Sequence, residues 1–226
     1  MYRRLEVVMF NKIDMEKWER AEHYKYYTAF LKTNYTMNVE IDITKLYKFV
    51  KSKGLKFFPA MLYAVIKGVN MNKEFRMAYK DGELGYYDHC DPSYTIFHPD
   101  DKTFSDLWSE YHEDFMTFYN GVVEDLEKYR DVKGVKVKDG RGENFCPISS
   151  VPWVNFTSVS HDTYTEPGML FPVIVFGKFV EKDGKVLIPL SVFATHAVAD
   201  GWHTSKLVND IQENVNSVDS WIGENL

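Results

Sequence analysis

Hydrophobic and polar residues alternate in some parts of the chain and recur at helical spacing in others. Tyr35 to Ile41 alternates in this way, which predicts a half-buried strand, and the apolar residues of 202–218 recur every three or four positions, which predicts a helix. Further helices are predicted over 15–31, 44–54, 59–69 and 105–129, and further strands over 94–98, 153–159, 173–181 and 185–195. We expect a mixed sheet covered by helices.

Cap and turn residues mark the ends of these elements. Asp14 and Thr44 are expected to cap two of the helices. The pairs Asp81-Gly82 and Asp183-Gly184 predict tight hairpins, and the polar stretch 131–144 predicts a loop within one domain. The fold class expected is α/β (α+β), a two-layer sandwich, with residues 1–226 forming a single domain.

Composition excludes several classes of protein. The formal charge of -6, with basic residues scattered among acids, argues against nucleic-acid binding. Residues 1–10 do not resemble a secretion signal, and no apolar run approaches the roughly 18 residues that span a bilayer. Without such a run we expect no membrane contact. Cys90 and Cys146 form no close pair, so we expect a protein of the reducing cytoplasm. The 16% aromatic content is compatible with an aromatic core, a ligand pocket or a subunit interface.

The strongest candidate for chemistry is the stretch 189–203. An apolar strand is expected to end at Thr195-His196, and a helix is expected after Gly201, so His196 falls in a strand-to-helix connection. A histidine there is commonly structural, but an imidazole can also act as a base at neutral pH. His196 and His203 have no third residue at metal-ligand spacing, so no metal site is expected.

The run from His196 to Gly201 resembles the His-x-x-x-Asp-Gly signature of the chloramphenicol acetyltransferase family. Residues 56–59, 75–78, 93–98 and 148–156 also resemble the family, in the expected order, so the likeness covers nearly the whole chain. The resemblance implies a CoA-dependent acyltransferase fold with acetyl-CoA as co-substrate. It also implies a homotrimer with active sites at subunit interfaces, and transfer of an acetyl group to a hydroxyl of chloramphenicol, which confers antibiotic resistance.

The resemblance also assigns roles to individual residues. His196 would be the general base, without an acyl-enzyme, Ser149 would donate to the oxyanion, and an ion pair of Arg20 with Asp200 would brace the loop that carries His196. The residues implied in binding acetyl-CoA are Lys56, Phe58, Ser105, Trp153, Lys178 and Phe179. Those implied in binding the acceptor are Tyr27, Leu31, Thr33, Phe104 and Val173.

The sequence departs from the family pattern near the expected base. Thr195 and Ala199 stand where the family usually has His and Cys, and Val175 replaces a threonine, so we expect slow turnover. Val159, His161, Thr33 and Pro147 are further departures on the acceptor side. Two alternatives stay open: an acyltransferase of the same fold with another alcohol or amine acceptor, including the dihydrolipoyl type, and a weakly active protein that binds the ligand or CoA.

Overall fold

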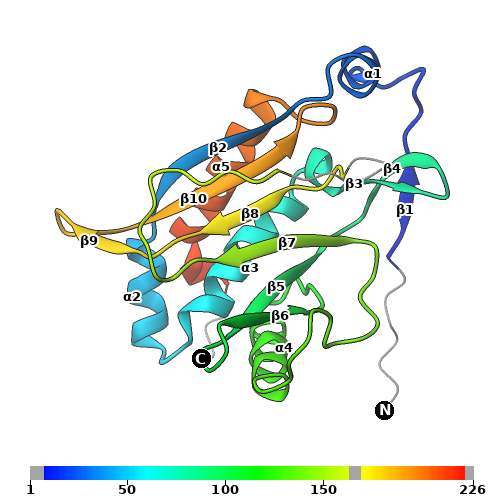
Figure 1. Cartoon of the computed structure of the whole chain (residues 1–226). Coiled ribbons are helices and arrows are strands. Elements are labelled where there is room, and N and C mark those ends of the chain that lie inside the picture. The colour runs from blue at the N-terminus through cyan, green and yellow to red at the C-terminus, as the bar shows by residue number, and fades with distance from the viewer. Residues whose placement is uncertain (1–7, 163–168, 222–226) are drawn as a thin grey trace.

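The computed structural model describes residues 8–162 and 169–221. Residues 1–7, which belong to the stretch expected to lack a secretion signal, lie outside that range. The main sheet has the strand order β2-β10-β8-β7-β5-β6, with β9 paired to β10 beyond the end of β8 (Figure 1). Its strands are β2 (Asn34–Asp42), β5 (Asp91–His98), β6 (Thr103–Trp108), β7 (Phe145–Ser150), β8 (Val173–Phe176), β9 (Val180–Lys182) and β10 (Lys185–Thr195).

Both parallel and antiparallel pairs occur in this sheet. β7 runs parallel to β5 and to β8, whereas β10 is antiparallel to β2, β8 and β9, and β5 to β6. The expected mixed sheet is therefore confirmed. The long β10 pairs with nine residues of β2 and carries the chain directly to His196.

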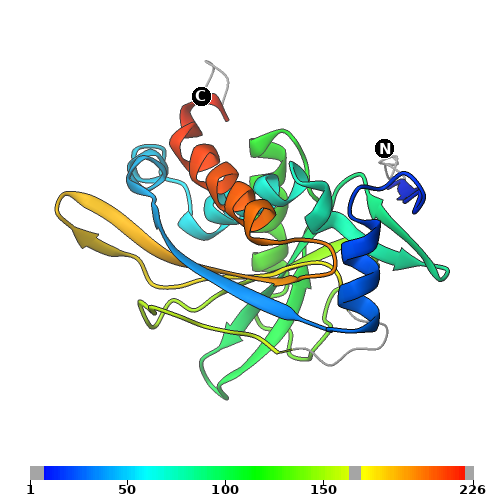
Figure 2. The ribbon, with the colours of Figure 1, turned by 90° about the horizontal axis from the view of Figure 1, so that it is seen from above.

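Four helices cover one face of the sheet (Figure 2). They are α2 (Thr44–Ser52), α3 (Phe57–Asn70), α4 (Phe115–Lys128) and α5 (Gly201–Asn216). α3 is central and apolar, and it packs against both α4 and α5. The helix-facing residues of β7, β8 and β10, such as Ile148, Ile174 and Val192, are fully buried, so hydrophobic burial holds this layer together.

A small sheet of order β1-β4-β3 lies beside the main one and consists of β1 (Phe10–Lys12), β3 (Met77–Lys80) and β4 (Glu83–Tyr87). The 3-10 turns η1 (Lys73–Arg76) and η2 (Val218–Ser220) complete the described elements. Both predicted hairpins are confirmed, because Asp81, Gly82, Asp183 and Gly184 all have φ between 51° and 78°. Positive φ at both central residues is the geometry of the tight turn that Asp-Gly favours.

The prediction of one helix over 105–129 is wrong in its first half. Residues 103–108 form β6, which pairs with β5 through a turn at Asp101 and Lys102, and α4 begins only at Phe115. The cause is visible in the alternation of β6, whose Ser105 and Leu107 are buried while their neighbours are not. Two-residue periodicity and pairing with β5 prevail over helix propensity there.

The strand prediction around Trp153 is displaced by several residues. The strand is β7, at 145–150, and residues 153–159 form irregular chain that begins with a turn and has no ladder pairing. Their polar groups bond elsewhere: Lys178 N–H donates to Val154 O at 2.9 Å, and Val159 N–H to the side chain of Asn38 at 3.0 Å. The segment 151–162 thus runs over the sheet face that the helices leave free (Figure 2).

The predicted strand over 173–181 is interrupted at Gly177. A side chain there would lie 2.7 Å from Pro189 and 2.8 Å from Phe156, so the close approach of these two rings requires glycine. β8 and β9 are consequently separate strands that pair with different parts of β10.

The first predicted helix is shorter than expected. α1 spans Ala21–Ala29, with Arg20 as its N-cap residue. Asp14 instead caps a preceding turn, where its side chain accepts from Glu16 N–H at 3.1 Å and its backbone oxygen from Trp18 N–H at 3.0 Å. Thr44 is the first residue of α2 rather than its cap. The N-cap residue is Ile43, which has no polar side chain, and the side chain of Asp42 just before it accepts from Thr44 N–H at 3.0 Å.

Candidate active site

His196 lies directly after β10, where aromatic rings hold its imidazole. The Tyr27 ring is stacked on it, with centroids 4.0 Å apart and 8° between the planes, and the Tyr35 ring meets it edge-on at 5.2 Å. His196 N–H donates to Thr33 O at 3.0 Å, which ties the residue to the start of β2. Nδ1 is buried and has no hydrogen-bond partner in the described part of the chain. Packing therefore orients the ring and closes Nδ1 off from solvent.

Arg20 connects α1 to the loop after His196. Its guanidinium donates to Asp200 Oδ2 at 2.5 Å and to the backbone oxygen of His196 at 3.3 Å. The side chain of Arg20 is only 13% exposed, so this pair is partly desolvated, unlike an ordinary surface ion pair. The expected ion pair is thus present, and the same guanidinium also holds the backbone of His196.

Asp200 has a second role as the N-cap of α5. Its Oδ1 accepts from Trp202 N–H at 3.0 Å and lies 2.8 Å from Nδ1 of His203. Burial is the largest influence on the Asp200 pKa and raises it, but the bonds from His203 and Arg20 together lower the pKa to about 2. The sequence analysis missed the role of His203. The signal was its place three residues after an N-cap, where a side chain can reach back to the capping residue.

Ser149 lies in β7 on the face of the sheet opposite the helices. It is in register with Val175 of β8, which is in register with Ser191 of β10. The hydroxyl of Ser191 donates to Val159 O at 2.9 Å, so the segment 151–162 covers this face of the sheet at β10, two strands from Ser149. Val175 is 2% exposed and presents a methyl group where a threonine would present a hydroxyl.

Within one chain, Ser149 and His196 cannot face the same reacting atom. Ser149 lies on the same face of the sheet as Ser191. His196 packs against Tyr35, and Tyr35 is paired in register with Ala194, which lies on the opposite face. Ser149 lies two strands from Ser191, at about 4.8 Å per strand, and His196 lies five residues further along the chain from Ser191, at about 3.3 Å per residue. The Cα atoms of Ser149 and His196 are therefore roughly 19 Å apart. An oxyanion donor and a base must both lie about 3 Å from adjacent reacting atoms.

The residues implied in cofactor binding form two groups. Lys56, Lys178 and Trp153 are exposed, and Trp153 packs edge-on against Phe97 at 4.8 Å. Phe58 and Phe179 are half-buried. The Phe58 ring packs on Tyr94 and Phe176, and the Phe179 ring on Tyr47 and Phe57.

Ser105 differs from the other cofactor candidates. It is fully buried and donates to Val132 O at 2.9 Å, and its oxygen lies 2.8 Å from Nε2 of His98. This leaves no surface of Ser105 for a ligand.

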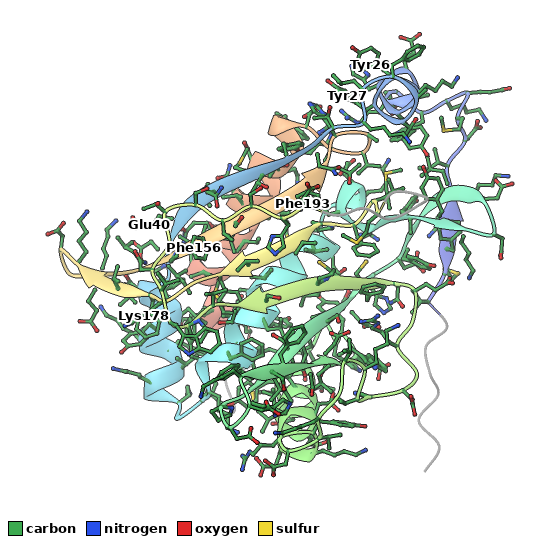
Figure 3. All side chains as sticks on the ribbon, in the orientation of Figure 1. Tyr26, Tyr27, Glu40, Phe156, Lys178 and Phe193 are labelled. Carbon is green, nitrogen blue, oxygen red and sulfur yellow. The ribbon has the colours of Figure 1, made fainter. Side chains whose placement is uncertain are left out.

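The residues implied in acceptor binding lie at two places. Tyr27 stacks on the His196 ring and Thr33 bonds the His196 backbone, while Leu31, between them in the chain, is exposed. Val173 is in register with Phe193 on the face of Ser149, and Phe104 is exposed in β6. Tyr27 and Lys178 lie near opposite ends of the sheet (Figure 3). Base-side and cofactor-side residues are therefore far apart within one chain.

Metal-binding clusters and membrane-spanning helices are both absent from the described residues. Across 8–162 and 169–221, no three or more His, Cys, Asp and Glu side chains gather where they could hold a metal ion. Over the same ranges, no helix is both long and apolar enough to cross a membrane.

The fold is that of the CoA-dependent acyltransferases. A solved structure described as a probable dihydrolipoamide acetyltransferase from Listeria monocytogenes superimposes with a TM-score of 0.59 at 16% identity, over 95% of each chain. At that identity the likeness concerns the fold alone.

A solved chloramphenicol acetyltransferase superimposes with a TM-score of 0.79 at 25% identity, over 92% of this chain and 100% of the other. The family description "Chloramphenicol acetyltransferase" matches residues 8–212. A protein of that name from Clostridium perfringens is 41% identical over 216 residues, which are 95% of this chain and 99% of the relative. The chain therefore belongs to the chloramphenicol acetyltransferase family.

Proposed function

We propose that this protein transfers the acetyl group of acetyl-CoA to a hydroxyl of chloramphenicol and so confers resistance to the antibiotic. The observation that carries the proposal is the imidazole of His196, packed between Tyr27 and Tyr35 with Nδ1 buried, on a loop that Arg20 and Asp200 brace. Family membership supplies the substrates.

In the proposed mechanism His196 takes the proton of the acceptor hydroxyl on Nε2. The acceptor oxygen attacks the thioester carbonyl directly, and the hydroxyl of Ser149 donates to the oxyanion that forms. Collapse of the tetrahedral intermediate breaks the carbon–sulfur bond, and the imidazolium returns its proton to the departing thiolate. The products are the acetyl ester and free CoA, and the histidine is neutral again.

We further propose that the active site forms between two subunits, in a homotrimer. The opposite faces of Ser149 and His196, and the roughly 19 Å between them, support a base from one chain and an oxyanion donor from the next. A cytoplasmic location and a single domain over 1–226 belong to the same proposal. One continuous cluster of buried side chains, from Ile13 to Trp221, supports the single domain.

The assignment of Lys56 and Lys178 to the phosphates of acetyl-CoA, and of Trp153, Phe58 and Phe179 to its adenine and pantetheine, is also part of this proposal. The two lysines are exposed, as phosphate contacts require. Phe58 and Phe179 serve the core as well as any ligand, because each packs against two buried or half-buried rings. Ser105 is not included, since its buried hydroxyl is bonded within the chain.

The decisive experiment is release of free CoA from acetyl-CoA with chloramphenicol as acceptor, followed with a thiol reagent. We expect release in the wild type and a loss of roughly two to four orders of magnitude in His196→Ala. His112 is exposed and remote from the motif, so His112→Ala is the matched control and should keep wild-type turnover. Antibiotic-independent release, or an active His196→Ala, would contradict the proposal. No release would direct a screen toward other alcohols and amines.

A further inference from the structure

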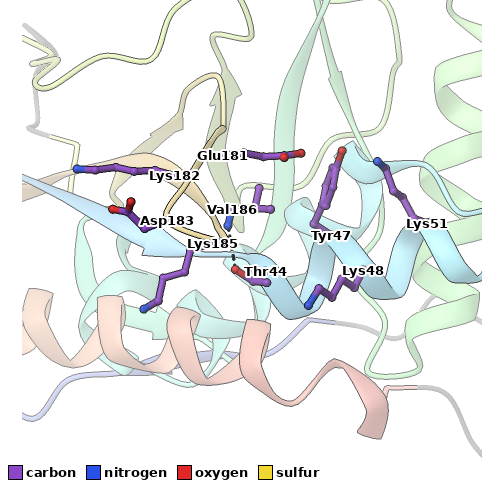
Figure 4. Close-up of a pocket in the computed structure, with 10 residues that line it drawn as sticks. Thr44, Tyr47, Lys48, Lys51, Glu181, Lys182, Asp183, Lys185 and Val186 are labelled. Atoms are coloured by element: carbon purple, nitrogen blue, oxygen red, sulfur yellow. Dashed lines mark hydrogen bonds between the residues drawn. The ribbon is translucent and has the colours of Figure 1, made fainter.

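A pocket of about 470 Å³ lies between α2 and the β9–β10 hairpin (Figure 4), at the end of β10 opposite to His196. Thr44 ties its two walls together, because its hydroxyl accepts from Val186 N–H at 2.9 Å. The volume is within the range of small-molecule sites in proteins. The residues that line it are Thr44, Tyr47, Lys48, Lys51, Glu181, Lys182, Asp183, Gly184, Lys185 and Val186.

The pocket is positive although the protein is negative. Four lysines face two carboxylates there, whereas the whole chain carries a formal charge of -6. Lys185 pairs with Asp42 at 3.2 Å, and the Lys51 ammonium lies over the Tyr47 ring, 4.3 Å from its centroid. In the described part of the chain, Lys48 and Lys182 belong to no ion pair at 4.0 Å or less. Their charge is available to an anion.

One aromatic ring connects the pocket to the proposed cofactor lysines. Tyr47, in the pocket wall, packs on Phe179 with centroids 5.1 Å apart, and Phe179 also packs on Phe57 at 5.5 Å. Lys178 directly precedes Phe179, and Lys56 directly precedes Phe57. The pocket therefore lies next to the place where the phosphates of acetyl-CoA are proposed to bind.

We propose that this lysine pocket is an outer binding site for the phosphates of acetyl-CoA, which captures the cofactor before its thioester reaches His196. The inference rests on the proposed function. A polyanion is repelled by a chain of net negative charge and attracted only where positive groups cluster. Screening by salt limits that attraction to about 10 Å at moderate ionic strength. Lys48, Lys51 and Lys182 extend the positive surface outward from Lys56 and Lys178, which raises the rate of association rather than the rate of chemistry.

The test is the double variant Lys48→Glu/Lys182→Glu, with Lys73→Glu/Lys128→Glu as a matched control that makes the same change in net charge on η1 and α4. We expect kcat/KM for acetyl-CoA to fall about five- to tenfold at low ionic strength in the pocket variant, with kcat unchanged. The dependence of kcat/KM on salt should weaken in the pocket variant, and the control should stay within about twofold of the wild type. An equal fall in both variants, or none in the pocket variant, would overturn the inference.

A binding measurement separates this inference from the proposed function. The association rate of CoA itself, followed by tryptophan fluorescence without an acceptor, should fall in the pocket variant and not in the control. Inorganic pyrophosphate should slow CoA association in the wild type and much less in the pocket variant. A wild type that binds CoA but shows no turnover would refute the acceptor assignment alone. Equal association rates in all three proteins would refute the pocket alone, and a wild type that does not bind CoA would refute both.

Discussion

The ring of Tyr27 lies parallel to the imidazole of His196, with 4.0 Å between centroids. We expect Tyr27→Ala to lower kcat about tenfold, because an unsupported imidazole spends less time in the reactive orientation. Tyr27→Phe keeps the ring and should keep kcat. If the Tyr27 hydroxyl contacts the acceptor, Tyr27→Phe will raise the KM for chloramphenicol. Steady-state kinetics of both variants separate the two roles, and a wild-type kcat in Tyr27→Ala would contradict the positioning role.

The pair of Arg20 and Asp200 should show strong energetic coupling. In a double-mutant cycle with Arg20→Met and Asp200→Asn, we expect a coupling of about 1–2 kcal/mol in the free energy of unfolding, because both groups are partly desolvated. Each single variant should also lose about tenfold or more in kcat, since Arg20 holds the backbone oxygen of His196. Coupling below about 0.5 kcal/mol would place the pair among ordinary surface ion pairs.

The low pKa of Asp200 predicts an acid-dependent loss of stability. Because the folded pKa, about 2, is below the ordinary carboxyl value, the ionised form stabilises the fold. That contribution is complete above about pH 5 and is lost as the pH falls toward 2. Asn also caps helices well, so Asp200→Asn removes the charge and keeps the cap. The stability difference between wild type and variant, from urea unfolding, should be constant above about pH 5 and shrink below pH 4. A constant difference down to pH 2 would contradict the assignment.

The proposed active site between two subunits predicts complementation between inactive chains. Ser149→Ala and His196→Ala should each lose at least two orders of magnitude in turnover. Co-expressed in equal amounts, they form mixed trimers in which one of three sites has both intact residues, so about a quarter of wild-type turnover should return. Co-expression of Ser149→Ala with the double variant Ser149→Ala/His196→Ala is the control and should restore nothing. Without recovery in the first mixture, the site cannot lie between subunits.

Val175 predicts a gain of activity. A threonine at this place in β8 has nearly the same shape, and its hydroxyl lies in register with Ser149, where it can help to hold a water on the oxyanion. We expect Val175→Thr to raise kcat several-fold at a small cost in stability, because the site is buried. Val175→Ala, which adds no donor, is the control. An unchanged or lower kcat in Val175→Thr would show that the valine does not limit turnover.

The long, strongly patterned elements could be predicted from the sequence. β2 alternates cleanly, and α5 has an apolar face and an Asp N-cap, so both follow from local periodicity. The failures lie where long-range contacts decide. Pro147 gives β7 little strand propensity, yet the strand is central because Cys146 and Ile148 bury fully between β5 and β8. From the sequence, Gly177 could not be distinguished from an ordinary strand residue, because the close approach of Pro189 and Phe156 is a contact of the folded chain.

The candidate site was predictable only with the family resemblance. His196 and Asp200 could be located in a strand-to-helix connection from pattern alone, and Arg20 could not, because 180 residues separate it from Asp200. No local pattern predicts that Ser149 and His196 lie on opposite sides of the sheet. That depends on the order β10-β8-β7, which is a property of the folded chain.

The placement of Ser149 and His196 on opposite sides of the sheet has a kinetic consequence for newly made protein. On the proposed mechanism, a chain that has completed its hydrophobic core still lacks a working site, because its base has no oxyanion donor beside it. Activity then begins at assembly and not at folding. After dilution from denaturant, the recovery of turnover should lag behind the recovery of fluorescence, and the lag should shorten steeply as the protein concentration rises.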